Sequence, residues 1–127
     1  EGATGERDAN EAVGLIRRVV ADLDQCAVQA STGDYTTKGT ATLDNCYEEE
    51  AAAAKEVAVA AGALVSAVAE SQTVLGTASK NFANSIARFG DSTKSLAGAT
   101  GDVVTQSELF GNSKTLGAAS QQLVMAT

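Results

Sequence analysis

Apolar and small residues recur at helical spacing along most of the chain. Counted from Leu75, they occupy offsets 0, 3, 4, 7, 8, 11, 14, 15 and 18, which form one slowly drifting face of a helix. The same offsets counted from Ala12, Glu50 and Leu109 also fall mostly on apolar or small side chains. Such stripes are typical of helices that bury one face against their neighbours. The pattern therefore predicts an all-α protein.

Breaks rich in Gly, Ser and Thr divide this pattern into four predicted helices. Residues 31–42 are expected to form a long loop, and 71–72 and 98–102 are expected to form short breaks. Residues 1–7 are expected to be a flexible lead-in. The predicted helices run over about 8–30, 44–69, 73–96 and 105–127.

Polar residues at the expected helix starts support these boundaries. Asp8 or Asn10 is a good N-cap for the first helix. Thr105, followed by Glu108, fits a capping box at the start of the last helix. Each helix would be about 35 Å long at a rise of about 1.5 Å per residue. Short connections favour antiparallel neighbours, so we expect residues 1–127 to form one domain, an up-down antiparallel four-helix bundle.

Composition excludes several classes of function. The chain has no His, so neither a Ser-His-Asp triad nor a His-ligated metal site can be assembled. The formal net charge of −7 argues against nucleic acid as a partner. No apolar run is long enough to predict insertion into a membrane. We therefore expect a protein without enzymatic activity, cofactor or metal.

The two cysteines, Cys26 and Cys46, do not have the spacing of a metal site. They are interpreted as small buried residues that stay reduced. A disulfide between neighbouring helices is the alternative.

Glycines inside the predicted helices suggest that the bundle is only modestly stable. Each costs about 1 kcal/mol relative to Ala in a helix interior. Their sum is comparable with the roughly 5–15 kcal/mol by which a whole domain is stable. The sequence therefore favours a bundle that is able to open. These glycines are Gly62, Gly76, Gly90, Gly111 and Gly117.

Three segments resemble helices of the talin rod. They read VVADLDQCAVQASTG at 19–33, ESQTVLGTASKNFANSIARFGDSTKSLAG at 70–98 and TQSELFGNSKTLGAASQQLVMAT at 105–127. The resemblance covers residues 9–127, because the order of helices and breaks also matches. It is greatest to the late rod bundle that is associated with the second integrin-binding site. That bundle usually has a fifth helix, so a five-helix rod bundle lacking one helix stays open as an alternative.

The resemblance implies a cytoplasmic, cytoskeleton-associated adaptor at cell–matrix adhesions, which binds the cytoplasmic tail of a β integrin and is linked indirectly to actin. In the family, this contact involves basic residues one turn apart on the fourth helix. Lys114 matches one of them, whereas Ala118 stands where the other is expected. Lys94 and Lys80 are candidate helpers. An ordinary solvated lysine is the simpler interpretation of Lys114.

The resemblance also implies a second binding mode, in which a buried amphipathic helix binds vinculin after the bundle opens. Plain core packing is the simpler interpretation of the same side chains, and sharing of the stripes between chains in an oligomer is another. The candidate helix face consists of Leu75, Phe82, Ile86, Phe89, Leu109, Leu116, Leu123 and Val124.

Overall fold

The computed structural model describes residues 2–35 and 42–127, and it confirms the predicted all-α fold. Four helices cover nearly all of these residues, and they correspond one to one with the four predicted from the sequence. Their bounds are α1 (Gly2–Ser31), α2 (Leu43–Ala67), α3 (Gln72–Thr100) and α4 (Val103–Ala126).

The first helix begins earlier than its sequence suggests. We expected a flexible lead-in over residues 1–7, but α1 is already helical from Gly2. The reason is a tertiary contact, because Gly5 is buried against the start of α3. A Cβ added at Gly76 would lie 2.8 Å from the Cα of Gly5, so the two backbones almost touch. Packing thus supports helix where local sequence does not.

The predicted capping box of α4 is also wrong. Asp102 is the N-cap, and its Oδ2 accepts hydrogen bonds from the backbone N–H of Thr105 at 3.0 Å and from its hydroxyl at 2.6 Å. An Asp side chain at the N-cap satisfies one of the free N–H groups of the first turn. Gly101 precedes it with a positive φ of 63° and ends α3 in the left-handed conformation.

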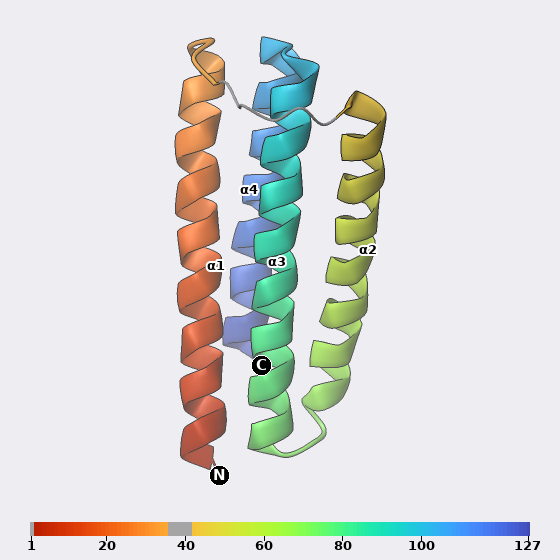
Figure 1. Cartoon of the computed structure of the whole chain (residues 1–127). Helices are drawn as coiled ribbons and strands as arrows, with labels where there is room; N and C mark the ends of the chain where they lie inside the picture. The colour runs from red at the N-terminus through yellow and green to blue at the C-terminus, as the bar shows by residue number, and fades with distance from the viewer. Residues whose placement is uncertain (1, 36–41) are drawn as a thin grey trace.

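The helices alternate in direction, but sequence neighbours are not always neighbours in space. In Figure 1, α1 and α3 run upwards, α2 and α4 run downwards, and α1 and α2 lie on opposite sides of the α3–α4 pair. Helix α3 packs against all three others, and α1 also packs against α4. No Cα of the described part of α2 lies within 8 Å of one in α1 or α4.

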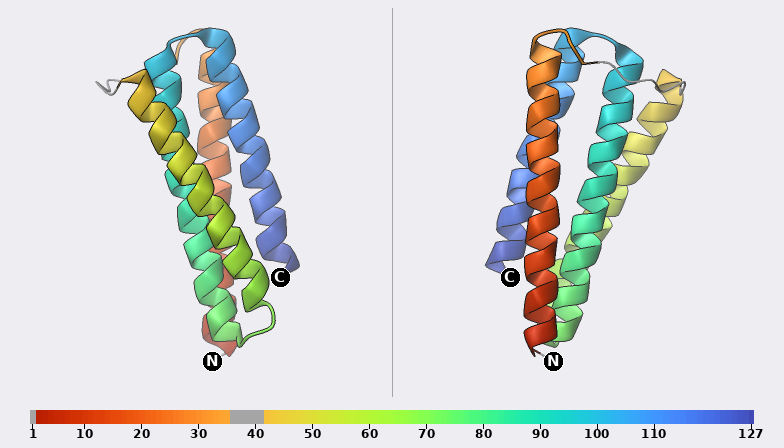
Figure 2. Two further views of the ribbon diagram at one scale, coloured as in Figure 1. Left: turned by 90° about the vertical axis from the view of Figure 1, so that its right-hand side faces the viewer. Right: turned by 60° about the vertical axis from the view of Figure 1, so that its left-hand side comes forward.

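This arrangement corrects one expectation and keeps the bundle. We expected neighbouring helices to be antiparallel, whereas α1 lies beside α3, which runs parallel to it. Residues 32–42 separate α1 from α2 in the sequence, so no tight turn forces these helices together. Both described ends of the chain lie at the lower end of the bundle (Figure 2).

Two clusters of buried side chains form the core. The larger one joins all four helices around Phe82 and Ile86 of α3. The smaller one lies near the upper end and contains Leu23, Tyr35 and Phe110. Small polar residues also enter the core, where their hydroxyls donate to carbonyls of the preceding helical turn, as Ser79 does to Leu75 at 2.9 Å and Ser120 to Leu116 at 2.8 Å.

Candidate functional site

Helix α1 is seated in notches made by glycines of α3 and α4. Val19 faces Gly90, where an added Cβ would lie 3.1 Å from its Cγ1. Val20 faces Gly117, where an added Cβ would lie only 2.6 Å from its Cγ2. The glycines therefore allow a close approach of the helices that Ala would hinder. This explains why glycine interrupts an otherwise apolar stripe.

The three candidate integrin-contact lysines all make ion pairs with α1. Lys94 Nζ lies 2.6 Å from Asp22, and Lys114 Nζ lies 2.9 Å from Asp24. Lys80 lies 3.4 Å from Glu11 and 3.7 Å from Asp8. Local sequence does not indicate these pairs, because each one joins helices that are far apart in the chain.

These lysines do not form one compact patch. Lys80 and Lys94 are fourteen residues apart on α3, which is about 21 Å along the helix axis. Lys114 projects from α4 instead of α3, and its partner on α1 is Asp24 rather than Asp22. Only Lys94 and Lys114 pair with the same turn of α1, the ADLDQ segment at 21–25.

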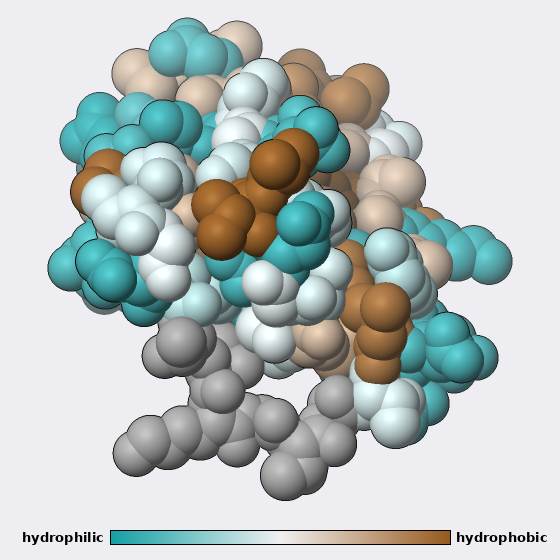
Figure 3. Space-filling view, turned by 90° about the horizontal axis from the view of Figure 1, so that it is seen from above, coloured by the Kyte–Doolittle hydropathy of each residue, from teal (hydrophilic) through white to brown (hydrophobic). Residues whose placement is uncertain are grey.

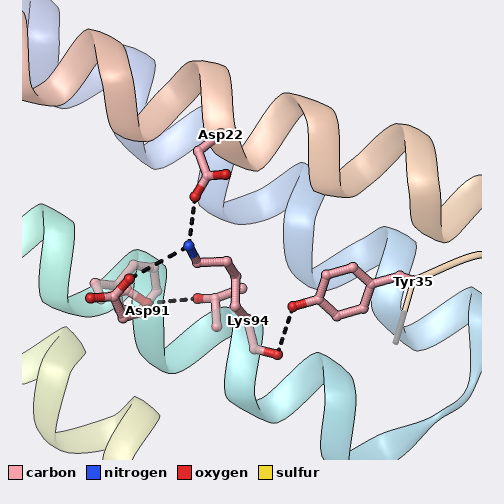
Figure 4. A network of polar contacts seen from close by, with 6 residues as sticks. Asp22, Tyr35, Asp91 and Lys94 are labelled. Carbon is pink, nitrogen blue, oxygen red and sulfur yellow. Dashed lines mark hydrogen bonds and ion pairs between the residues drawn. The ribbon is translucent and has the colours of Figure 1, made fainter. Parts of the chain in front are cut away.

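Lys94 is the centre of a small polar network near the upper end of the bundle (Figure 4). Its ammonium group contacts Asp22 of α1 and, at 3.6 Å, Asp91 of its own helix. The hydrogen bond with Asp22 is the main reason why the pKa of Lys94 is raised, although partial burial opposes the shift. The hydroxyl of Tyr35 donates to the Lys94 carbonyl oxygen at 3.0 Å.

Tyr35 lies in the core, although it belongs to the segment predicted to be a loop. Its ring packs edge-on against Phe110, with centroids 4.8 Å apart. Burial is the main cause that raises the pKa of Tyr35 to about 12, and electrostatic interactions with Cys26 and Asp22 add to the shift. The sequence signal for this buried position was a lone aromatic residue in a segment rich in Gly and Thr. Of the remaining predicted loop, residues 36–41 lie outside the described part of the chain.

The candidate vinculin-type face of α3 lies in the core. Leu75, Phe82 and Ile86 are buried, and Phe89 is half-buried against the same cluster. The structure therefore brings these side chains together on the buried side of α3.

The corresponding face of α4 is rotated relative to the prediction. Val124 is buried, but Leu109, Leu116 and Leu123 are only half-buried. Phe110, which the stripe omitted, is 0% exposed. The buried residues of α4 are Gln106, Phe110, Ser113, Gly117, Ser120 and Val124.

The displaced leucines line an apolar groove between α2 and α4. Leu116 and Leu123 form one wall, Val57 of α2 lies on the other, and Phe82 of α3 also lines the groove. Its volume is about 450 Å³. The groove is nearly without polar atoms. Small residues of α2 and α4 complete its lining, and they are Ala54, Ala58, Ala61, Ala119 and Ser120. Part of the predicted binding face of α4 is thus accessible in the closed bundle.

A chain of polar side chains crosses the core beside this groove. Glu50 of α2 accepts a hydrogen bond from the Thr93 hydroxyl of α3 at 2.8 Å, and Thr93 Oγ1 lies 3.0 Å from Ser113 Oγ of α4. Burial raises the pKa of Glu50, and the hydrogen bond from Thr93 opposes this shift. Thr93 and Ser113 are buried, whereas Glu50 is half-buried.

Cys26 and Cys46 are both buried and free. Within residues 2–35 and 42–127, no group of three or more Cys, Asp or Glu side chains is placed to hold a metal ion. No helix of the described chain is sufficiently long and apolar to cross a bilayer. Val103 and Val104 at the start of α4 are exposed. Seen from above, hydrophobic and hydrophilic residues both lie on this end of the molecule (Figure 3).

Comparison with known proteins gives consistent matches. A family model described as Talin 1-like, rod segment domain, matches residues 5–127. Talin-A of Dictyostelium discoideum is 30% identical over 138 aligned residues, which cover 100% of this chain and 6% of Talin-A. Talin-B of the same organism is 29% identical over 128 residues, which cover 99% of this chain and 5% of Talin-B. No solved structure matches significantly.

Proposed function

Because the chain belongs to the talin rod segment family, we propose that it is a module of a cytoskeletal adhesion adaptor that binds the cytoplasmic tail of a β integrin. The chain spans only about a twentieth of the length of the two talins, 6% and 5%, so it would act as one bundle among others. In this role it would be cytoplasmic, at cell–matrix adhesions, and linked indirectly to actin.

The observation that supports an integrin contact is the exposed position of Lys114. Its side chain is 42% exposed, and its partner Asp24 is more exposed still. An exposed pair of this kind contributes about 0–1 kcal/mol, so an acidic residue of a tail can replace Asp24 at little cost. Lys94 of α3 pairs with the same turn of α1 as Lys114 does, so it can assist in binding the tail. Lys80 lies too far along α3 to contact the same short segment of a tail.

Two opposite substitutions test this contact. We expect Lys114→Met to weaken binding of a β integrin tail peptide and Asp24→Asn to strengthen it, because the second change frees Lys114. Amide chemical-shift titration of the folded chain at two salt concentrations measures both effects. Equal affinities for the two variants, or shifts far from Lys114, would contradict the assignment.

A second candidate function, binding of vinculin to a released helix, is supported by the half-buried leucines of α4. Leu109, Leu116 and Leu123 are already partly accessible, so fewer contacts must break before α4 offers them to a partner. Helix α3 would have to leave the core entirely, since Leu75, Phe82 and Ile86 are buried. We therefore favour α4 over α3 as the vinculin-binding helix.

The test loosens the bundle without changing α4. Leu64→Ala on α2 removes a fully buried side chain, whereas Val65→Ala on the same helix removes one that is 60% exposed. We expect the first variant to increase the affinity for the vinculin head domain and the second to leave it unchanged, as measured by calorimetry. Unchanged affinity in both variants would argue against a cryptic site.

A further inference from the structure

Helix α2 is attached to the bundle on one side only. Its described residues pack against α3, and none of its Cα atoms lies within 8 Å of α1 or α4. By contrast, α1, α3 and α4 all pack against one another. In Figure 1, α2 is the outermost helix, on the side away from α1. The three other helices therefore keep their mutual contacts if α2 moves away.

The polar link that holds α2 to this core is incomplete. Glu50 Oε1 accepts from Thr93 at 2.8 Å, but Glu50 Oε2 is buried and has no hydrogen-bond partner among the described residues. Thr93 Oγ1 also contacts the Phe89 carbonyl oxygen at 2.9 Å and Ser113 at 3.0 Å, so its single proton is shared. A carboxylate held in this way is poorly solvated in the docked state.

No cation on the neighbouring helices compensates this carboxylate. Arg88 of α3 pairs with Glu56, and Lys94 of α3 pairs with Asp22 on the side of α1. Lys114 of α4 pairs with Asp24. These three cations of α3 and α4 are therefore engaged elsewhere, and within the described part of the chain the hydrogen bond to the Glu50 carboxylate comes from the shared Thr93 hydroxyl.

We propose that α2 is a separately opening arm of the bundle and that Glu50 is the latch, whose ionised form weakens the docking of α2 on α3. When α2 undocks, Phe82, Leu116 and Leu123 lose the opposite wall of their groove and become accessible. Helix α1 stays in place, because the glycine notches and its ion pairs do not involve α2. This opening does not depend on which partner then binds the uncovered face.

The direction of the pKa of Glu50 agrees with this geometry and fixes the sign of the effect. Its pKa is raised in the docked state, first by burial, with the Thr93 hydrogen bond acting in the opposite direction. Protonation therefore favours docking. This stabilisation is fully present below the pKa of the undocked carboxyl, and it is lost as the pH rises through the higher pKa of the docked carboxyl.

Two cysteines report opening without any added probe site. Cys46 of α2 is 0% exposed and Cys26 of α1 is 6% exposed, so each reacts with a thiol reagent only when its own helix opens. The experiment labels the intact chain with a pyridyl disulfide for increasing times and identifies the labelled cysteine by peptide mass spectrometry. We expect Cys46 to react at least about tenfold faster than Cys26, since α2 lacks the contacts that seat α1.

Substitutions at Glu50 distinguish an effect on the docking of α2 from an effect on the stability of the whole bundle. Glu50→Gln and Glu50→Met both remove the charge, and the second also removes the unsatisfied polar atom. We expect each to slow labelling of Cys46 at neutral pH by about tenfold, as estimated from the cost of one buried unsatisfied group, and to leave Cys26 unchanged. Glu49→Gln, which makes the same charge change at an exposed neighbour, should alter neither rate.

Acid provides the last comparison. The difference between the wild-type chain and Glu50→Gln should shrink as the pH falls, because wild-type Glu50 becomes protonated. Equal reaction rates of Cys46 and Cys26 in the wild-type chain would overturn the separate arm. Unchanged labelling of Cys46 in both Glu50 variants, or an equal effect of Glu49→Gln, would overturn the latch.

Discussion

Helices α1 and α2 are both long helices on the flanks of the same α3–α4 pair, yet they are held in different ways. Val19 and Val20 of α1 enter notches at Gly90 and Gly117, and acids along α1 pair with lysines of both neighbours. Helix α2 contacts α3 alone, with an exposed Glu56–Arg88 pair and the incomplete link at Glu50.

The difference shows that small core residues have two effects in this bundle. Where a glycine meets a valine of a neighbouring helix, the missing side chain brings backbones close and strengthens packing. Where alanines of α2 face α4 across an apolar groove, the two helices do not approach each other, and the small side chains leave the groove unfilled. The same composition therefore secures one flank of the molecule and loosens the other.

The largest expected effect comes from truncating one buried leucine side chain on each flank. Leu23→Ala in α1 and Leu64→Ala in α2 each remove a buried side chain, at a cost of about 2–5 kcal/mol. We expect Leu23→Ala to lower the protection of backbone amides from hydrogen exchange throughout the bundle. Leu64→Ala should lower this protection mainly in α2. Residue-resolved amide hydrogen exchange distinguishes the two. If Leu64→Ala accelerated exchange equally in all four helices, the two flanks would not differ.

A smaller effect is expected at the glycines of α4. Gly117→Ala places a Cβ 2.6 Å from Val20, and we expect a net loss of stability, because overpacking costs about 1–3 kcal/mol against a helix-propensity gain of about 1 kcal/mol. Gly111→Ala is the matched control on the same helix, since an added Cβ there meets nothing within 4 Å. It should be stabilising by up to about 1 kcal/mol. Urea unfolding measures both, and a gain at both positions would rule out the notch.

The smallest expected effect concerns the ion pair on each flank. A double-mutant cycle with Asp22→Asn and Lys94→Met should give a coupling of about 0.2–1 kcal/mol near neutral pH. The pKa of Lys94 is raised in the fold, so this contribution is fully present below the unfolded pKa and is lost as the pH rises through the folded pKa.

The pair between Arg88 and Glu56 on the α2 flank provides the contrast. Its coupling should persist in alkali, because the guanidinium group of Arg stays protonated. Urea unfolding at neutral and alkaline pH measures both cycles. A coupling between Asp22 and Lys94 that survives deprotonation of the lysine would mean that packing of the side-chain stems, rather than charge, joins α1 to α3.

The sequence predicted four helices and the buried face of α3, because helical periodicity is a local property that neighbouring residues carry together. It did not predict that α1 begins at Gly2, since the contact of Gly5 with α3 is formed by residues about seventy positions apart. The rotation of α4 was missed for a similar reason. Its leucines and Phe110 lie on adjacent sides, and the positions of α1 and α3 decide which side is covered.

The candidate lysines illustrate the same limit. Lys80, Lys94 and Lys114 could be chosen from the resemblance to a family, but nothing local shows that each faces an acid of α1. Asp22 and Asp24 are two positions apart, so they point to different sides of the helix and reach different neighbours. Their roles depend on α1 packing against both α3 and α4.

By itself, the sequence determined that this chain is an all-α bundle, that its helices mix small with large apolar residues, and that it lacks the histidines on which many catalytic and metal sites depend. Periodicity and composition are sufficient for these conclusions. Only the tertiary structure decided which glycines are notches, which lysines are paired, and which helix is least attached. Those properties arise from contacts between distant segments, and the contacts exist only when the helices have taken their places.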